Sequence, residues 1–209
     1  GVITAGVLIP RAGYPENSDV RAFTDRALAA IRTVPGVVNA GATTIIPLGG
    51  NHSDSVILAE GYEMQPGESL VSPMQLVVTP GYFEAMGTPL VRGRYFTESD
   101  DETSPAAVIV DARLAQKFWP GADPIGRRMY QPRNPQDLLA VDENTRWLTV
   151  VGVVSEVQLD DLAGSPDSVG AYYFPAKQQA PRGLVFAIKA AIDPESVMGS
   201  VRTAIRGID

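Results

Sequence analysis

"LVFAIKAAIDPESVMGSVRTAIRGID" (residues 184–209) is a strand followed by a helix, and it decides the fold. The strand covers residues 184–192. Asp193 can cap the helix, and Pro194 takes the first helical position, where its missing N–H costs nothing. Apolar residues then recur at steps of three and four, as on one face of a helix: Val197, Val201, Ala204, Ile205 and Ile208.

The N-terminus of the chain follows the same plan. Residues 2–10, "VITAGVLIP", are rich in β-branched residues and predict a strand. Ser18 is the expected N-cap of a helix, with Asp19 favourable in its first turn. One apolar stripe follows: Val20, Phe23, Ala27, Ile31 and Val34. Residues 35–36, Pro-Gly, end the helix, and residues 37–47 form the next strand.

Together these two ends predict a weak two-fold internal repeat of β-α-β units, split by a long insertion. The second unit needs one more strand, which is expected to follow Asp209. The chain also begins and ends abruptly within regular structure, and both ends read as cut from a larger protein. We therefore expect the second unit to expose a strand edge.

The insertion between the two units is richer in strands. Pro175 favours a sheet edge for the strand or edge piece that contains it. Gln131 to Arg146 is expected to be a long, mobile hairpin loop. The expected elements are a helix at 81–87, a helix capped by Asp111, and strands at 55–62, 72–80, 106–110, 125–131, 145–158 and 170–176.

Segregated β-α-β units and a strand-rich insertion predict an α+β protein with two subdomains. The first half of one subdomain is expected at residues 1–80 and its second half at residues 181–209, truncated before its last strand. The inserted subdomain is expected at residues 81–180.

Composition excludes several classes of function. The net charge is −7, and no Lys or Arg occurs between Arg32 and Arg92, which argues against a nucleic-acid surface. The chain has no cysteine, so disulfides, thiolate catalysis and Cys-ligated zinc are excluded. No apolar run approaches the roughly 18 residues that a membrane span needs.

The polar loops offer weak candidates for a site. The single histidine, His52, has no Cys or second His nearby and is expected to be a solvated loop residue. The sequon Asn51-His52-Ser53 matters only in a secreted eukaryotic protein. An acidic cluster lacks the spacing and the glycine of a calcium loop and is expected to be a solvated turn: Glu98, Asp100, Asp101 and Glu102. Residues 159–168 are a similar acidic loop that could recruit a cation weakly.

No catalytic, cofactor-binding or metal-binding residue is assigned. The chain lacks G-x-S-x-G, a second His to act as base, and both glycine-rich nucleotide motifs. The corner "LAQKFWPGADPIGRRM" (114–129) follows a helix, whereas phosphate sites use helix N-termini. Phe118 and Trp119 are expected to anchor that helix in the core. Arg127 and Arg128 should point to opposite faces of a strand and cannot clamp one ligand.

A family resemblance runs through nearly the whole chain. It rests on the repeat-bearing ends and on three motifs: "VTPGYFEAMGTPLVRGRYFTESDD" (78–101), "AAVIVDARLAQKFWPGADPIGRRM" (106–129) and "WLTVVGVVSEVQ" (147–158). The chain resembles the periplasmic core domain of MacB-like (FtsX-like) ABC-transporter permeases. It is most similar to the duplicated permeases first noted in acidobacteria.

The resemblance implies a domain at the extracytoplasmic (periplasmic) face of the bacterial inner membrane, within an integral membrane protein. In that family, two transmembrane helices bracket a porter-like part of two β-α-β repeats with an inserted Sabre-like part. The implied partner is a cytoplasmic ATP-binding subunit, and any periplasmic substrate or partner is unidentified. The expected function is non-catalytic coupling of ATP hydrolysis to movement outside the membrane.

Two other functions stay open from the residues. The first is a passive binding or sensing module of a membrane protein with no role in transport. The second is a hydrolase, which would need a buried acidic pair in a cleft. The isolated chain is not expected to form a stable dimer.

Overall fold

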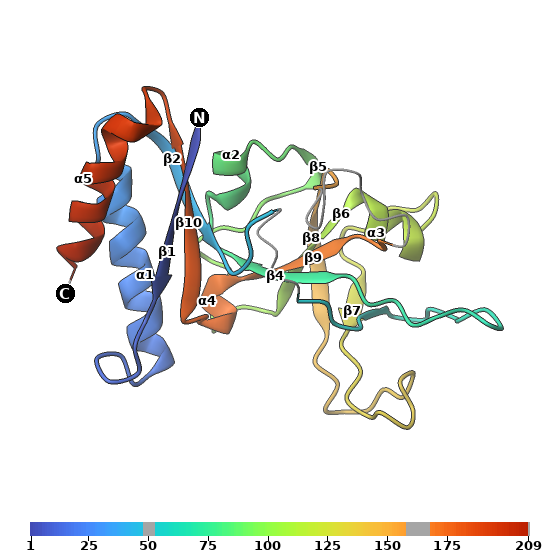
Figure 1. Cartoon of the computed structure of the whole chain (residues 1–209). Coiled ribbons are helices and arrows are strands. Elements are labelled where there is room, and N and C mark those ends of the chain that lie inside the picture. The colour runs from blue at the N-terminus through green and yellow to red at the C-terminus, as the bar shows by residue number, and fades with distance from the viewer. Residues whose placement is uncertain (48–52, 158–167, 209) are drawn as a thin grey trace.

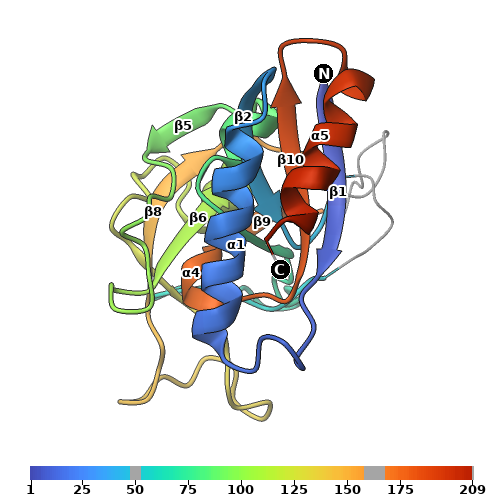
Figure 2. The same ribbon diagram turned by 90° about the vertical axis from the view of Figure 1, so that its left-hand side faces the viewer.

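Two helices cover one face of a three-stranded part of the sheet (Figures 1 and 2). The computed structural model describes residues 1–47, 53–157 and 168–208. Within them, the three-stranded part consists of β1 (Val2–Leu8), β10 (Gly183–Ala190) and β2 (Val37–Thr43), with helices α1 (Asn17–Arg32) and α5 (Pro194–Arg206).

The two repeated units interleave in this part. β10 lies between β1 and β2 and is antiparallel to both, so β1 and β2 run parallel. β1 pairs along its whole length, from Val2 opposite Lys189 to Leu8 opposite Gly183. The strand of the second unit is therefore inserted between the two strands of the first.

The buried faces of both helices follow their apolar stripes. In α1 the predicted residues Val20, Phe23, Ala27 and Ile31 are all buried, and in α5 the buried residues are Val197 and Val201. The expected N-cap of α1 is wrong, because Glu16 takes that position and Ser18 lies inside the helix. The backbone N–H of Glu16 donates to the carboxylate of Asp19 at 2.9 Å, as in a capping box.

The other strands extend the sheet from β2 in the order β4-β9-β6-β8-β7-β3, with β5 paired to β8. Among the described residues, this seven-stranded part contains β3 (Leu58–Ala59), β4 (Met74–Val78), β5 (Leu90–Gly93), β6 (Ala107–Asp111), β7 (Arg128–Tyr130), β8 (Leu148–Val154) and β9 (Ala171–Pro175). Its helices are α2 (Tyr82–Met86), α3 (Ala112–Phe118) and α4 (Ala176–Gln179). The protein is thus a mixed α+β fold.

Several details differ from the expected elements. β9 is not at an edge: it lies between β4 and β6, and Pro175 is tolerated because it is the last residue of the strand. The strand expected at 55–62 is reduced to Leu58–Ala59. β5 and α4 were not predicted, because four residues are too few to show a period.

The division into subdomains stays a prediction. β4, within the expected first half, pairs with β9 along its length but meets β2 only where Thr43 faces Val78. β3 likewise pairs with β7 of the insertion. α2, expected in the insertion, packs against β2: a Cβ at Gly41 would lie 2.2 Å from the backbone nitrogen of Tyr82.

β1 is the terminal strand of the three-stranded part. No described strand pairs with its outer side, and a groove of about 390 Å³ lies between β1 and α5. Ile3 and Val7 line the groove from the strand, and Met198 and Ile205 line it from the helix. The strand expected after Asp209 stays a prediction.

The helix-to-strand corner at residues 114–129 is built around a buried acid. As expected, Asp111 caps α3: its Oδ1 accepts a hydrogen bond from the backbone nitrogen of Leu114 at 2.8 Å. Phe118 and Trp119 are each 7% exposed and belong to the core. Asp111 is 1% exposed. Burial raises its pKa to about 6, although backbone N–H donors at Leu114 and Ala171 oppose the shift.

This raised pKa predicts a loss of stability as the pH rises. The unfolded chain loses the Asp111 proton near pH 4, whereas the folded chain holds it until about pH 6. Relative to an Asp111→Asn variant, the free energy of unfolding should therefore fall by up to about 3 kcal/mol between about pH 4 and pH 7. Urea unfolding of both proteins across this range measures the difference. A difference that stays constant with pH would contradict the assignment.

Candidate functional site

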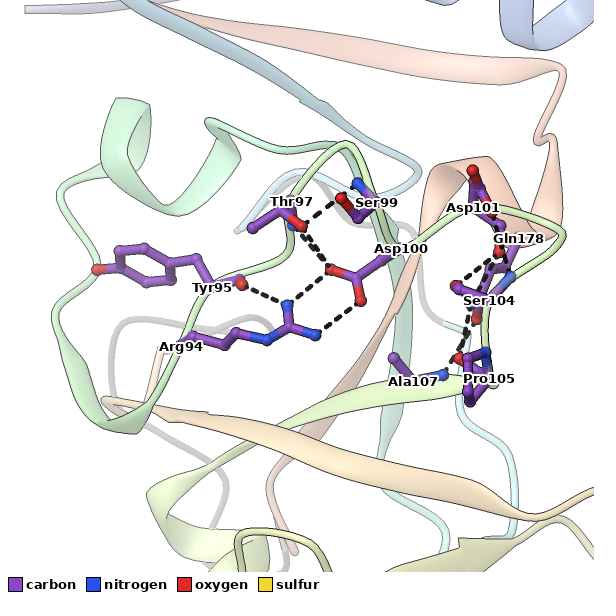
Figure 3. Close-up of polar contacts among 10 residues, drawn as sticks. All are labelled: Arg94, Tyr95, Thr97, Ser99, Asp100, Asp101, Ser104, Pro105, Ala107 and Gln178. Carbon is purple, nitrogen blue, oxygen red and sulfur yellow. Dashed lines mark hydrogen bonds and ion pairs between the residues drawn. The ribbon is translucent and has the colours of Figure 1, made fainter.

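The loop at residues 94–105 is held by a buried acid at the junction of the two parts (Figure 3). The Asp100 carboxylate accepts two hydrogen bonds from the Arg94 guanidinium, at 2.8 and 2.9 Å, and one from the backbone nitrogen of Thr97 at 2.8 Å. Asp100 is 4% exposed. Burial alone would raise its pKa, but the bonds from Arg94 and Thr97 outweigh burial and lower it.

The expected solvated turn is therefore wrong at Asp100. Glu98 and Glu102 are exposed. The Asp101 carboxylate closes a local turn by accepting bonds from the hydroxyl and backbone nitrogen of Thr103, at 2.7 and 2.9 Å. These bonds lower the pKa of Asp101. Spacing along the chain did not reveal that Arg94 folds back on Asp100.

Gln178 of α4 fastens the same loop to the seven-stranded part (Figure 3). Its Nε2 lies 3.0–3.1 Å from three acceptors, which are the carbonyl oxygens of Asp101 and Pro105 and the hydroxyl of Ser104. Its Oε1 accepts from the backbone nitrogen of Ala107 at 3.1 Å. Both ends of one side-chain amide are thus used, and the loop and α4 form one hydrogen-bonded unit.

The neighbouring residue, Lys177, connects this unit to α1. Its Nζ lies 2.6 Å from the Glu98 carboxylate and 3.3 Å from the Asp25 carboxylate of α1. The Lys177 side chain is 22% exposed. Its hydrogen bond to Glu98 is the main cause of a raised pKa, with a further contribution from Asp25. One ammonium group therefore bridges a carboxylate from each part.

Arg21 makes a second connection, one helical turn before Asp25. Its Nε donates to the backbone carbonyl of Lys177 at 2.7 Å, across 156 positions of sequence. Its guanidinium lies 3.5 Å from the Glu102 carboxylate. A crevice of about 20 Å³ remains between α1 and α4. Figure 2 shows α4 beside the lower part of α1.

The sheet is narrow at the same junction. Beside the pair Thr43–Val78, the backbone nitrogens of Thr44 and Thr79 donate to the carbonyls of Val77 and Ala42, at 3.0 and 2.9 Å. Two threonine hydroxyls accept the return bonds. The hydroxyl of Thr44 accepts from the backbone nitrogen of Val77 at 3.0 Å, and that of Thr79 accepts from Ala42 at 2.7 Å. Full ladders, by contrast, join the strands on either side.

The chain also crosses between the parts at Ala180, just after α4. Ala180 is the one non-glycine residue with a positive φ (50°) among those described. This left-handed conformation costs on the order of 1 kcal/mol outside glycine. Pro181 follows, and β10 begins at Gly183. A strained, short connection therefore stands beside the ion pairs of Lys177.

The two arginines of the corner bind different partners. The Nε of Arg127 donates to the carbonyl of Asp123 at 2.8 Å. Arg128 forms an ion pair with Glu60, and its guanidinium lies 4.3 Å from the ring centroid of Trp147. Arginine stacked on an indole face is a stabilising surface contact.

The other sequence candidates gather no site within the described residues. No group of three His, Cys, Asp or Glu is placed there to hold a metal ion. His52, most of the sequon and most of the acidic loop at 159–168 lie outside the described residues. The long loop projects away from the sheet (Figure 1), and Arg133 bridges its two sides by donating to the Asn144 carbonyl at 2.8 Å.

The buried acids do not form the pair that a hydrolase needs. Among the described residues they are Asp100 and Asp111. Asp100 is bound by Arg94, and Asp111 caps α3. A Cβ at Gly170 would lie 2.4 Å from the Asp111 carboxylate, so backbone closes over that group. Both acids therefore have structural partners.

Sequence reasoning missed Arg21 and Lys177, which join the two parts, and Gln178, which fastens the loop at residues 94–105 to α4. α4 is too short to show periodicity, and contacts across so many positions leave no local signal. At this junction a narrow strand crossing, the connection at Ala180 and the ion pairs of Lys177 lie close together.

Comparison with known proteins identifies the family of this mixed α+β domain. The family model of the MacB-like periplasmic core domain matches residues 2–207. The chain therefore belongs to this family, which places it at the periplasmic side of the bacterial inner membrane. No described helix combines the length and apolar character needed to cross a bilayer. The comparison with curated protein sequences gave no match.

Solved structures share the fold at low sequence identity. The periplasmic region of MacB from Actinobacillus actinomycetemcomitans is 14% identical, with a TM-score of 0.59 over 99% of this chain and 83% of that one. The extracellular domain of the noncanonic ABC-type transporter YknZ from Gram-positive bacteria is 15% identical, with a TM-score of 0.57 over 100% of this chain and 92% of that one.

Proposed function

We propose that the chain is the non-catalytic periplasmic domain of an ABC-transporter permease, in which cytoplasmic ATP hydrolysis moves the two parts of the domain relative to each other. The movement would act on a substrate or partner outside the membrane. Family membership supports the setting. The observation that carries the movement is the junction, where β2 meets β4 at one residue pair between two fully paired regions.

The β2–β4 crossing should be less stiff than the fully paired strands on either side of it. A strand pair bonded along its length resists bending, because many hydrogen bonds must break together. The β2–β4 crossing has fewer such bonds: two join backbone to backbone, and two end on threonine hydroxyls. Relative movement therefore concentrates at this crossing. An ATPase cycle can act on such an element only if its nucleotide states favour different arrangements.

Locking the two parts together tests this function. Cysteines replacing Asp25 and Glu98 can be joined by a short, reducible cross-linker, because both carboxylates contact the same ammonium group. The described domain has no other cysteine to interfere. In the parent permease, reconstituted in lipid with its ATPase, cross-linking should lower ATP turnover several-fold. Reduction of the linker should restore turnover.

A matched control uses cysteines at Ala29 and Thr33, which are exposed on and directly after α1 and lie within one part. Cross-linking that pair should leave turnover unchanged. Full turnover after complete cross-linking of positions 25 and 98 would overturn the coupling. A parent protein that purifies without any ATPase would favour the passive binding or sensing module instead.

A further inference from the structure

Lys177 is placed to restrain the two parts of the domain. It stands between Asp25 of α1 and Glu98 of the loop, three residues before the crossing at Ala180. We propose that Lys177 is an electrostatic latch, which holds α1 against α4 and releases it when its ion pairs are broken. The inference rests on the relative movement proposed above, and it names the contact that restrains that movement.

The charges of the seven-stranded part are held as one unit. Arg94 and Asp100 fix the loop that carries Glu98 and Glu102, and Gln178 fastens that loop to α4. Lys177 is therefore presented from a supported position. A long side chain held by its neighbours loses less conformational entropy when it forms an ion pair.

The spacing of Arg21 and Asp25 on α1 matches the positions of their partners in the other part. Arg21 and Asp25 are one helical turn apart and share a helix face. Arg21 faces Glu102 and the Lys177 carbonyl, and Asp25 faces the Lys177 ammonium. Opposite charges therefore meet at both positions. A shift of α1 by one turn along its axis would separate both pairs.

The surfaces behind these charges are only partly packed together. The crevice between them is lined by polar as well as apolar groups, including Thr24, Thr79 and Glu98. Asp25 is half exposed, at 49%, and Glu98 is 60% exposed. Water can reach both carboxylates when they part, so release leaves neither carboxylate buried and unpaired. Ion pairs of this kind are individually weak, which suits a contact that must break and re-form.

Spin labels on the 209-residue chain test the latch without any ATPase. Cysteines replacing Ala29 of α1 and Gln116 of α3 are exposed and lie on different parts. The distance distribution between the labels should show one dominant population in the native chain. Lys177→Met keeps an unbranched side chain, one atom shorter, and removes the charge. It should increase the minor population by roughly three- to tenfold, as expected for the loss of partly exposed ion pairs.

Two controls separate the latch from a general loss of structure. Lys189→Met removes an exposed lysine whose side chain has no partner among the described residues, and it should leave the distribution unchanged. Raising NaCl from about 50 mM to about 1 M should move the native chain toward the Lys177→Met distribution, because salt screens exposed charges. The salt titration needs no substitution at Lys177, so it remains decisive if that variant folds poorly.

The outcomes are distinct. A native chain that does not respond to salt, with a Lys177→Met distribution equal to the native one, would overturn the latch. If salt and Lys177→Met both change the distance distribution but the cross-linked permease keeps its full ATP turnover, the latch stands and the proposed coupling falls. If cross-linking lowers ATP turnover but neither salt nor Lys177→Met changes the distance distribution, the proposed coupling stands and the latch falls.

Discussion

Replacing Gly41 with alanine is expected to lower the free energy of unfolding by about 3 kcal/mol, because β2 and α2 approach too closely there for a side chain. A Cβ at Gly41 would lie 2.2 Å from the backbone nitrogen of Tyr82 and 2.4 Å from its Cα. Both are backbone atoms, so the strain cannot be relieved by turning a flexible side chain. α2 would have to move away from the sheet.

That movement would expose the apolar contacts of α2. Tyr82 and Phe83 are 3% and 2% exposed, and Phe83 packs edge-on against Tyr173 of β9. Urea unfolding measures the loss of stability, and near-ultraviolet circular dichroism reports the packing of these rings. α2 also lies at the junction of the two parts, so the variant should loosen the packing of α2 against β2 on the face of the sheet opposite α1.

Gly6→Ala is the matched control. Gly6 lies in β1, which is separated from β2 by β10, and no atom lies within 4 Å of the Cβ that alanine would add. Its free energy of unfolding should change by no more than about 0.5 kcal/mol. Equal stability of the two variants would show that α2 does not press on Gly41 as described.

Replacing Asp100 with alanine is expected to cost about 3 kcal/mol, the lower end of the range for breaking a buried ion pair. The Arg94 side chain is 49% exposed and regains water when its partner is lost, which limits the cost. The backbone nitrogen of Thr97 also loses its acceptor. The loop that presents Glu98 and Glu102 should then lose its fixed position.

The effect of Asp100 should depend on pH, with the opposite sign to that of Asp111. The pKa of Asp100 is lowered in the folded chain, so its contribution is present above about pH 4 and is lost as the pH falls. Asp101→Ala, which removes a carboxylate from a half-buried residue of the same loop, should cost about 1 kcal/mol or less. Chemical unfolding of both variants makes the comparison, and equal losses would contradict the buried role of Asp100.

Local patterns predicted much of the three-stranded part. The apolar stripe of α1 and the Asp193-Pro194 start of α5 depend on residues close together in the chain, and they hold in the structure. The Asp111 cap is local in the same way. The N-cap expected at Ser18 was wrong because Glu16 and Asp19 form a reciprocal capping pair, so the helix is capped two residues earlier.

The junction could not be predicted in this way. Acidic residues in a turn look alike in sequence. Only folding shows that Arg94 binds the buried Asp100, that Glu98 pairs with Lys177 and that Glu102 pairs with Arg21 of α1. The central place of β9 depends on pairing with β4 and β6, which Pro175 alone argued against.

The helix faces, the α+β class and the family resemblance could be predicted from the amino-acid sequence, because they follow from residue order within short windows and from motifs in series. The tertiary structure alone decided that β10 enters between β1 and β2, that β2 meets β4 at one pair, and that Lys177 bridges Asp25 and Glu98. Contacts between distant segments depend on the relative free energies of whole arrangements, which no local pattern records.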